Sequence, residues 1–145
     1  MVPLEFERTG SDGRAFVILP KREVFGDVTP WVWYAPTLPG LPGSEEEWMI
    51  EKFVDAGMAI AGIDVGESYG SPQGRSLYSA LYEDLVKKRG FSGKACLLAR
   101  SRGGVMTLSV VKGQGHTMWS GWFQCQELVD FVITHADKPD AGDGK

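Results

Sequence analysis

The sequence predicts an α/β fold with a mainly parallel sheet and helices on both of its faces. Two apolar runs, Met58–Ile63 and Ala95–Ala99, show no polar alternation, which is typical of parallel strands covered on both faces. Segments with helical periodicity precede both runs, and glycines end these segments at Gly57 and Gly90. Strands that alternate with helices in this way are characteristic of the α/β class.

The N-terminal region predicts an antiparallel hairpin. Leu4–Arg8 alternates apolar and acidic residues, Ala15–Leu19 is rich in β-forming residues, and Gly10–Gly13 between them has the composition of a turn. Aromatic and β-branched residues in Trp31–Ala35 predict the strand that follows the hairpin.

Three helices are predicted. The first begins with a capping box, in which Ser44 is the N-cap and Glu47 lies three residues later, and it ends near Ala56. The last helix spans about Trp122–His135. The second helix ends at Gly90 and carries two apolar rows with i, i+4 spacing. The rows are Leu77, Leu81 and Leu85, and Tyr78, Tyr82 and Val86.

The segment Met106–Val111 is compatible with two structures. A helix would bring Val105, Leu108 and Val111 to one face, whereas the β-branched content favours a strand. We prefer the strand.

Length and charge narrow the class of protein. The chain has 145 residues, so residues 1–136 are expected to form one small domain and the polar residues 137–145 a flexible tail.

The net charge is −4, and an acidic chain without a basic patch disfavours a nucleic-acid partner. The apolar runs are far shorter than the ~20 residues of a membrane-spanning helix. The acidic N-terminus is unlike a signal peptide, and the two cysteines form no ligand pair. We expect a cytoplasmic protein without a metal or a cofactor.

A chemical motif follows the predicted strand Ala95–Ala99. The residues Ala99–Gly103 read ARSRG, which is the nucleophile-elbow pattern G-x-S-x-G with alanine in place of the first glycine. The motif needs small residues two positions before and after the serine, because the sharp turn brings backbone segments close together. Ser101 is thus the candidate nucleophile, and the N–H of Arg102 is a candidate oxyanion donor. The alternative is an ordinary glycine-rich turn.

Two further loops carry candidate residues. The chain has two histidines. His116 lies in the glycine-rich loop KGQGH and is the better general base, whereas His135 ends the last helix, where a cation suits the helix dipole. Residues 37–43, rich in glycine and proline, follow the strand Trp31–Ala35. This loop either donates a second oxyanion N–H, from Leu38, or serves to orient the next helix.

At these residues the chain resembles the α/β-hydrolase superfamily, most of all the dienelactone-hydrolase and prolyl-peptidase-like esterases. The resemblance rests on the hairpin, WVWYAP with its loop, GIDVGESYG, LLARSRGG and GQGHTMW. It implies hydrolysis of small, short-acyl carboxylic esters through an acyl-enzyme. Ser101 would attack the ester, His116 would transfer the proton, and the N–H groups of Arg102 and Leu38 would bind the oxyanion.

The largest departure from the family lies between Ser101 and His116. Residues 102–115, 14 in all, separate Ser101 from His116, and none is Asp or Glu. In the family this interval holds further strand–helix units and the catalytic acid, so the chain resembles a truncated α/β-hydrolase that lacks its middle segment. Asp64, with Glu67 as second choice, leaves the strand expected next to the elbow strand and could replace the acid. Alternatively, both carboxylates cap or solvate their loop.

The missing units predict a partner. They would leave a sheet edge and an apolar face open, and such surfaces commonly pair with another chain. We therefore expect a homodimer in which the second subunit covers this edge, for instance by exchange of the segment after Gly104.

The arginines Arg100 and Arg102 would favour acidic substrates. The second functional hypothesis is a catalytically inactive, hydrolase-like remnant that serves as a binding or interaction domain.

Overall fold

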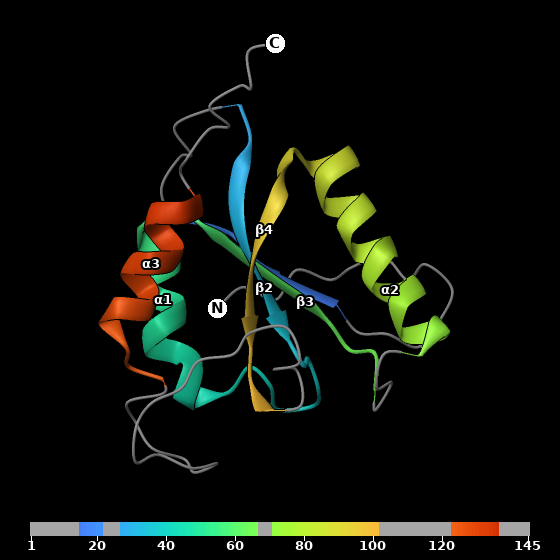
Figure 1. The fold of residues 1–145 in the computed structure, drawn as a ribbon, viewed down its shortest axis with the longest axis horizontal. Helices are drawn as coiled ribbons and strands as arrows, with labels where there is room; N and C mark the ends of the chain where they lie inside the picture. Colours follow the sequence, from blue (N-terminus) through green and yellow to red (C-terminus); the bar gives the residue numbers. More distant parts are fainter. Residues whose placement is uncertain (1–14, 22–26, 67–70, 102–122, 137–145) are drawn as a thin grey trace.

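The protein forms a four-stranded mixed sheet between helices (Figure 1). A computed structural model describes residues 15–21, 27–66, 71–101 and 123–136. The strand order is β1-β3-β2-β4. β2 runs parallel to both β3 and β4, and β1 is antiparallel to β3, which confirms the predicted α/β class with a mainly parallel sheet. The strands are β1 (Ala15–Ile18), β2 (Thr29–Ala35), β3 (Ala59–Ile63) and β4 (Phe91–Ala99).

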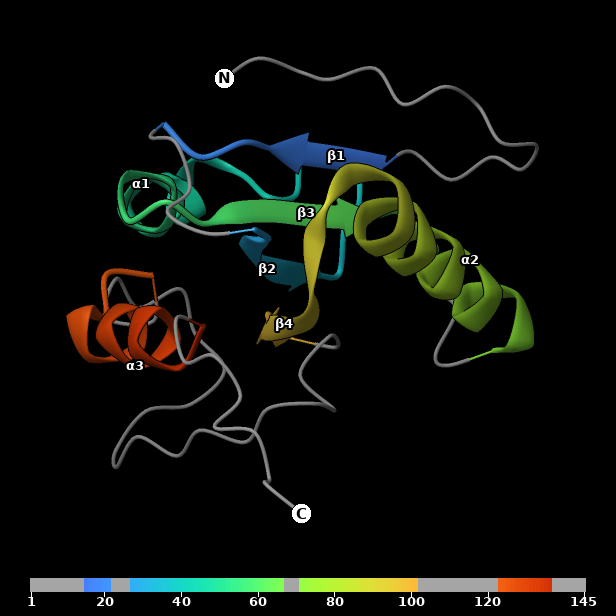
Figure 2. The same cartoon turned by 90° about the horizontal axis from the view of Figure 1, so that it is seen from above.

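Helices cover both faces of the sheet. Figure 2 shows α1 and α3 on one side and α2 on the other. The helices are α1 (Glu47–Asp55), α2 (Pro72–Glu83), which continues as a π-helical turn (Asp84–Lys88), and α3 (Gln126–Ala136). Within the ranges given above, no helix is long and apolar enough to cross a membrane.

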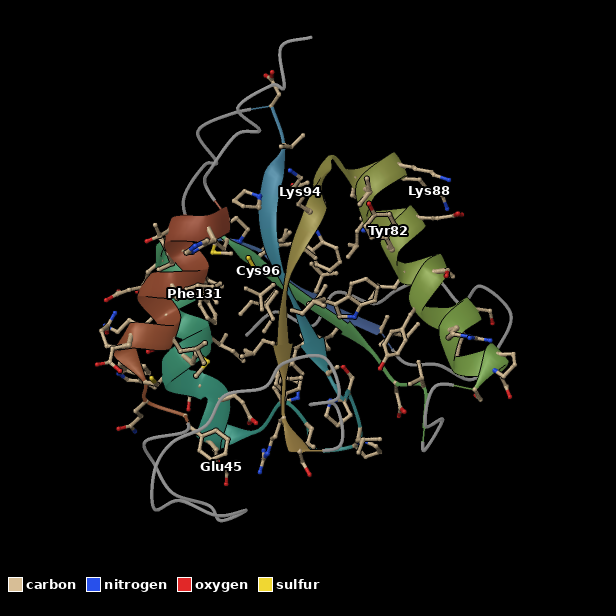
Figure 3. All side chains as sticks on the ribbon, viewed as in Figure 1. Glu45, Tyr82, Lys88, Lys94, Cys96 and Phe131 are labelled. Carbon is tan, nitrogen blue, oxygen red and sulfur yellow. The ribbon has the colours of Figure 1, made fainter. Side chains whose placement is uncertain are left out.

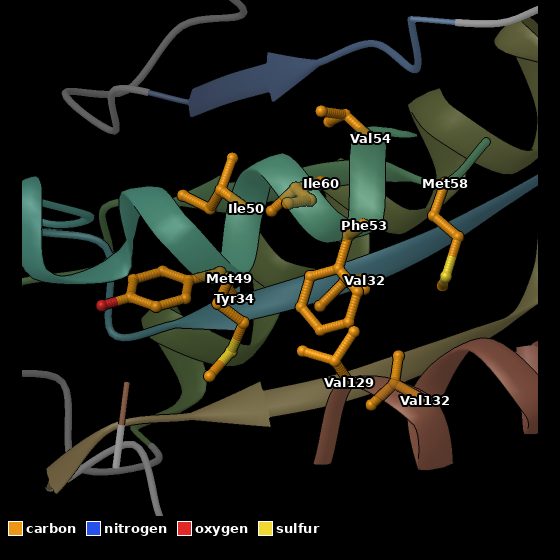
Figure 4. Close-up of a cluster of buried hydrophobic side chains, with 10 residues drawn as sticks. All are labelled: Val32, Tyr34, Met49, Ile50, Phe53, Val54, Met58, Ile60, Val129 and Val132. Carbon is orange, nitrogen blue, oxygen red and sulfur yellow. The ribbon is translucent and has the colours of Figure 1, made fainter. Parts of the chain in front are cut away.

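The main core lies between the sheet and the pair α1 and α3. Alternate residues of a strand face opposite sides of a sheet, so Val32 and Tyr34 of β2 point into this core while Trp31 and Trp33 face α2. Figure 4 shows the Tyr34 ring at one end of the cluster, with its hydroxyl oxygen directed away from the other side chains. The buried members are Val32, Tyr34, Met49, Ile50, Phe53, Val54, Met58, Ile60, Val129 and Val132.

A second, smaller core joins the sheet to α2. Trp31 is fully buried and stacks on Trp33, with 5.3 Å between ring centroids. Trp33 in turn meets the edge of Tyr78 from α2 at 5.5 Å. Leu81 and Leu85 are buried in the same cluster, so the predicted apolar row of this helix does face the sheet.

The strands and helices agree with the sequence in type and differ in detail. All five residues of β3 are buried, as expected of a strand covered on both faces. β4 begins at Phe91, earlier than predicted, and Leu97 is 44% exposed. The expectation that Ala95–Ala99 is fully buried is therefore wrong, because β4 lies at an edge of the described sheet and has a single strand neighbour there.

The predicted capping box is displaced by one residue. Ser44–Glu46 forms a 3₁₀ turn with Gly43 as its N-cap, and α1 begins only at Glu47. The carboxylate that accepts the N-cap N–H is that of Glu46, at 2.9 Å from the nitrogen of Gly43. The assignment to Ser44 and Glu47 is thus wrong, because Glu46 is drawn inward by further hydrogen-bond donors and Glu47 stays exposed.

Some predicted segments lie outside the described residues: Leu4–Arg8, Met106–Val111, Trp122 and the tail 137–145. Leu4–Arg8 is the predicted hairpin partner of β1, and the strand that pairs with β1 in the structure is β3.

Candidate active site

The candidate nucleophile follows the carboxyl end of β4. Register pairs Ala35 with Ala99, and the N–H of Arg100 then donates to the carbonyl oxygen of Ala35 at 2.8 Å, so β2 and β4 end together. Ser101 is the next residue, beside the loop that follows β2. In Figure 3, Glu45 marks this end of the molecule and Lys94 lies toward the opposite end of β4. Ligands of open parallel sheets bind beyond the carboxyl ends of the strands.

The backbone of Ser101 has a left-handed conformation. Its φ is +51°, and no other non-glycine residue of the described segments has a positive φ. A left-handed conformation costs a residue with a Cβ atom about 1–2 kcal/mol. Such residues occur mainly where the surrounding structure holds them and often at functional sites. Ser101 is exposed and follows a strand, two features that a nucleophile elbow requires.

A buried carboxylate lies beneath this turn. Glu46 is 4% exposed. Its Oε1 accepts hydrogen bonds from the Tyr34 hydroxyl at 2.8 Å and from Nη1 of Arg100 at 2.6 Å, and its Oε2 accepts the N–H of Gly43 at 2.9 Å. Three donors from three parts of the chain therefore converge on one carboxylate.

The surroundings of Glu46 shift the pKa values of its two side-chain partners, Tyr34 and Arg100. Burial raises the pKa of the Tyr34 hydroxyl far above its ordinary value, and its hydrogen bond to Glu46 adds to the rise. Burial acts to lower the pKa of Arg100, but the hydrogen bond to Glu46 and its charge outweigh this and raise the pKa. The Arg100 guanidinium also lies over the ring of Phe123, at 4.9 Å from its centroid. It thus faces inward, which gives no support to a role in binding acidic substrates.

Sequence reasoning missed Glu46 and Tyr34 as site residues. The run Glu45–Glu47 was interpreted only as a helix-capping signal, and nothing local distinguishes its middle member. Its partners are Tyr34 of β2, 12 positions away, and Arg100, which directly follows β4 and lies 54 positions away.

The loop after β2 is held by its own backbone. Leu41 donates to the carbonyl oxygen of Leu38 at 2.9 Å, and the N–H of Leu38 faces the carbonyl oxygen of Leu41 at 3.4 Å. The second contact is long for a hydrogen bond. Leu38 lies where an oxyanion donor is expected, on the loop next to the elbow strand, but its N–H is directed at Leu41.

Asp64 occupies a different place from the one expected. β2 lies between β3 and β4, so the strand that precedes Asp64 is not the neighbour of the elbow strand, and two strand spacings of roughly 10 Å in total separate them. The prediction of adjacency is therefore wrong, because β2 inserts between the two. Oδ1 of Asp64 accepts the N–H of Gly66 at 2.8 Å, the local turn that aspartate commonly makes.

Asp64 also acts on a neighbouring tyrosine. Burial raises the pKa of Tyr78, and the negative charge of Asp64 raises it further. Together with the Gly66 bond, these contacts fit a carboxylate that holds its own loop.

His135 lies away from the elbow. α3 follows Phe123, which contacts Arg100, and farther along the helix the carbonyl oxygen of Val132 lies 3.8 Å from Sγ of Cys96, nearer the middle of β4. His135 is one helical turn beyond Phe131, stacks on its ring, and places Nδ1 at 2.7 Å from its carbonyl oxygen. These contacts support the structural role expected for this histidine.

Three predicted site residues, Arg102, His116 and Glu67, lie outside the described residues. Where side chains are described, no group of three or more His, Cys, Asp or Glu residues could hold a metal ion. Cys96 and Cys125 form no disulfide. Comparison with known proteins gave no matching family model, no matching curated protein and no matching solved structure.

Proposed function

We propose that the protein is a serine-dependent carboxylic ester hydrolase with a truncated α/β-hydrolase fold, acting on small, short-acyl esters. The observation that carries the proposal is the left-handed backbone at Ser101, directly after β4 and beside the loop that follows β2. A positive φ is uncommon for a residue with a Cβ atom, and an elbow uses a strained turn to expose the hydroxyl oxygen of its serine.

The proposed reaction has two steps. Ser101 Oγ attacks the ester carbonyl carbon, His116 takes the hydroxyl proton, and the tetrahedral oxyanion is bound by backbone N–H groups of Arg102 and Leu38. Collapse expels the alcohol, which receives the proton from His116. Water then attacks the acyl-enzyme with His116 as base, which releases the carboxylic acid and restores the serine.

The geometry does not favour Asp64 as the catalytic acid. Asp64 is engaged by Gly66 and is separated from the elbow strand by β2. We therefore propose a Ser–His dyad, which retains useful rates on activated esters because oxyanion binding survives loss of a triad member. Asp64→Asn should then leave the maximal rate within about twofold of wild type, whereas a true acid would lose several thousandfold.

Hydrolysis of p-nitrophenyl acetate tests the proposal. Ser101→Ala should abolish turnover above the background rate, while Ser76→Ala, an exposed serine of α2, should have no effect. His116→Ala should lose activity and His135→Ala should keep it. Labelling with a fluorophosphonate, followed by mass spectrometry, should place the adduct on Ser101. Equal rates for wild type and Ser101→Ala would refute the assignment.

The inactive remnant is the second candidate. The direction of the Leu38 N–H toward Leu41 favours it, since this donor is not turned outward for an oxyanion. Absence of any fluorophosphonate adduct on the wild-type protein would support the remnant and contradict the esterase.

The homodimer remains part of the proposal. β4 is an edge strand of the described sheet, and its Leu97 is 44% exposed. Leu97→Lys should shift the protein toward monomer in size-exclusion chromatography, and Leu19→Lys, at another exposed leucine, should not. A wild-type protein that is monomeric at micromolar concentration would contradict the dimer.

A further inference from the structure

We infer that Glu46 is a positioning residue that holds both halves of the proposed active site, the serine turn and the loop after β2. The inference rests on the proposed function and names a residue that the motif does not contain. Glu46 acts through Arg100 and Gly43 and is not assigned a contact with substrate.

The first half of the site is held through Arg100. Its backbone N–H is fixed by Ala35 and its guanidinium by Glu46, at 2.8 and 2.6 Å. Arg100 immediately precedes Ser101, whose left-handed backbone is strained. A residue fastened at both its backbone and its side chain limits how far the next residue can relax, so the ion pair helps to maintain the turn.

The second half is held through Gly43. The other carboxylate oxygen of Glu46 accepts the Gly43 N–H at 2.9 Å. Gly43 is tightly enclosed, since a Cβ atom there would lie 3.0 Å from the carbonyl oxygen of Gly40. Gly40 and Leu38 belong to the same loop, so this bond limits movement of the segment that carries the proposed oxyanion donor.

A carboxylate is the group that this position requires. The Tyr34 hydroxyl, the Arg100 guanidinium and the Gly43 N–H are all used as donors here, and both oxygens of a glutamate accept. A glutamine offers one oxygen and one NH₂ group, and the NH₂ group cannot accept a hydrogen bond. Glu46→Gln therefore keeps the size of the side chain and must lose a bond on one side of the site.

Steady-state kinetics on p-nitrophenyl acetate test the inference. Glu46→Gln should lower kcat about 10- to 100-fold, the effect of a small displacement of reacting groups, and should leave KM within about twofold. Glu47→Gln makes the same chemical change one residue later on an exposed side chain and should match wild type. If Glu46→Gln does not fold, the double variant Glu46→Gln with Arg100→Gln, which buries no unpaired charge, should fold and show the same loss of kcat.

Hydrogen exchange supplies a readout that is independent of turnover. In Glu46→Gln, the amides of the non-proline residues in 38–43 and of residues 99–101 should exchange faster than in wild type, while those of α2 should not change. Unchanged exchange in these two segments, or an unchanged kcat in a variant that folds, would overturn the positioning role. Wild type without Ser101-dependent turnover would instead overturn the proposed function, and the exchange comparison would still decide whether Glu46 holds the turn.

Discussion

Arg100 and Glu46, 54 positions apart, form an ion pair in which Nη1 of the arginine lies 2.6 Å from Oε1 of the glutamate. The Glu46 side chain is 5% exposed and that of Arg100 is 22% exposed. The pair connects the end of β4 to the start of α1, where the proposed nucleophile and the proposed oxyanion loop meet.

Loss of Arg100 should destabilise the fold. Arg100→Ala leaves a buried carboxylate with its charge uncompensated, which we expect to lower the free energy of unfolding by about 2 kcal/mol, less than for a fully buried pair because Arg100 is partly exposed. The control is Arg89→Ala, whose bond to Asp84 is more exposed and should contribute at most about 1 kcal/mol. Urea denaturation of both variants measures the difference. Equal losses would contradict the importance of the buried pair.

The pKa of Tyr34 predicts how stability depends on alkaline pH. Its folded-state pKa is raised above the ordinary value of about 10, so the unfolded chain releases this proton at lower pH than the folded protein. The stabilisation is complete below pH ~10 and is lost as the pH rises above it. The stability advantage of wild type over Tyr34→Phe should therefore shrink above pH ~10, as measured by urea denaturation across a pH series. A constant difference between the two proteins would contradict the shift.

The conformation of Ser101 predicts an unusual order of stabilities. Glycine is ordinarily less stable than alanine in a folded segment, but it adopts a positive φ without strain. Ser101→Gly should therefore be more stable than Ser101→Ala by about 1 kcal/mol, although both lack the nucleophile. Thermal and urea unfolding of the two inactive variants provide the measurement. The reverse order would show that the serine does not occupy the left-handed region.

Gly62 predicts a steric limit in the middle of the sheet. A Cβ atom at this position would lie 2.7 Å from Cε1 of Phe16 and 2.9 Å from the backbone oxygen of Tyr34, and would overlap the side chain of Thr37. Gly62→Ala should therefore destabilise the protein by about 3 kcal/mol. Gly93→Ala is the control, since its Cβ atom would meet only the Tyr82 hydroxyl, at 3.5 Å. Similar stabilities of the two variants would contradict the close packing at Gly62.

Thr37 should tolerate loss of its hydroxyl group. The residue is 7% exposed, and its Oγ1 has no hydrogen-bond partner in the described part of the chain. Thr37→Val replaces the hydroxyl with a methyl group of similar size and removes a buried polar atom, so stability should rise by about 1 kcal/mol. Ser71→Ala provides the contrast, because its hydroxyl accepts the N–H of Gly74 at the start of α2 and its loss should destabilise.

The sequence by itself determined the elements whose signals are local. The uninterrupted apolar run of β3 and the apolar row Leu77, Leu81 and Leu85 reflect burial of consecutive or periodic residues, and both were predicted correctly. The glycines after α1 and after the π-helical turn adopt positive φ values, +87° at Gly57 and +72° at Gly90. Alanine and glycine near the serine likewise suggested a sharp turn at Ser101. In each case the cause lies within a few residues of its effect.

The tertiary structure alone decided which segments meet. The chain order of β2, β3 and β4 does not reveal that β2 lies between the other two, and this placement removed Asp64 from the neighbourhood of the elbow strand. Glu46 has two equally acidic neighbours, and only the approach of Tyr34 and Arg100 makes it the buried one. Strand order and ion pairing depend on contacts between residues that are distant in the sequence. Burial in the assembled fold sets the energies of these contacts, and no periodic pattern in the sequence marks them.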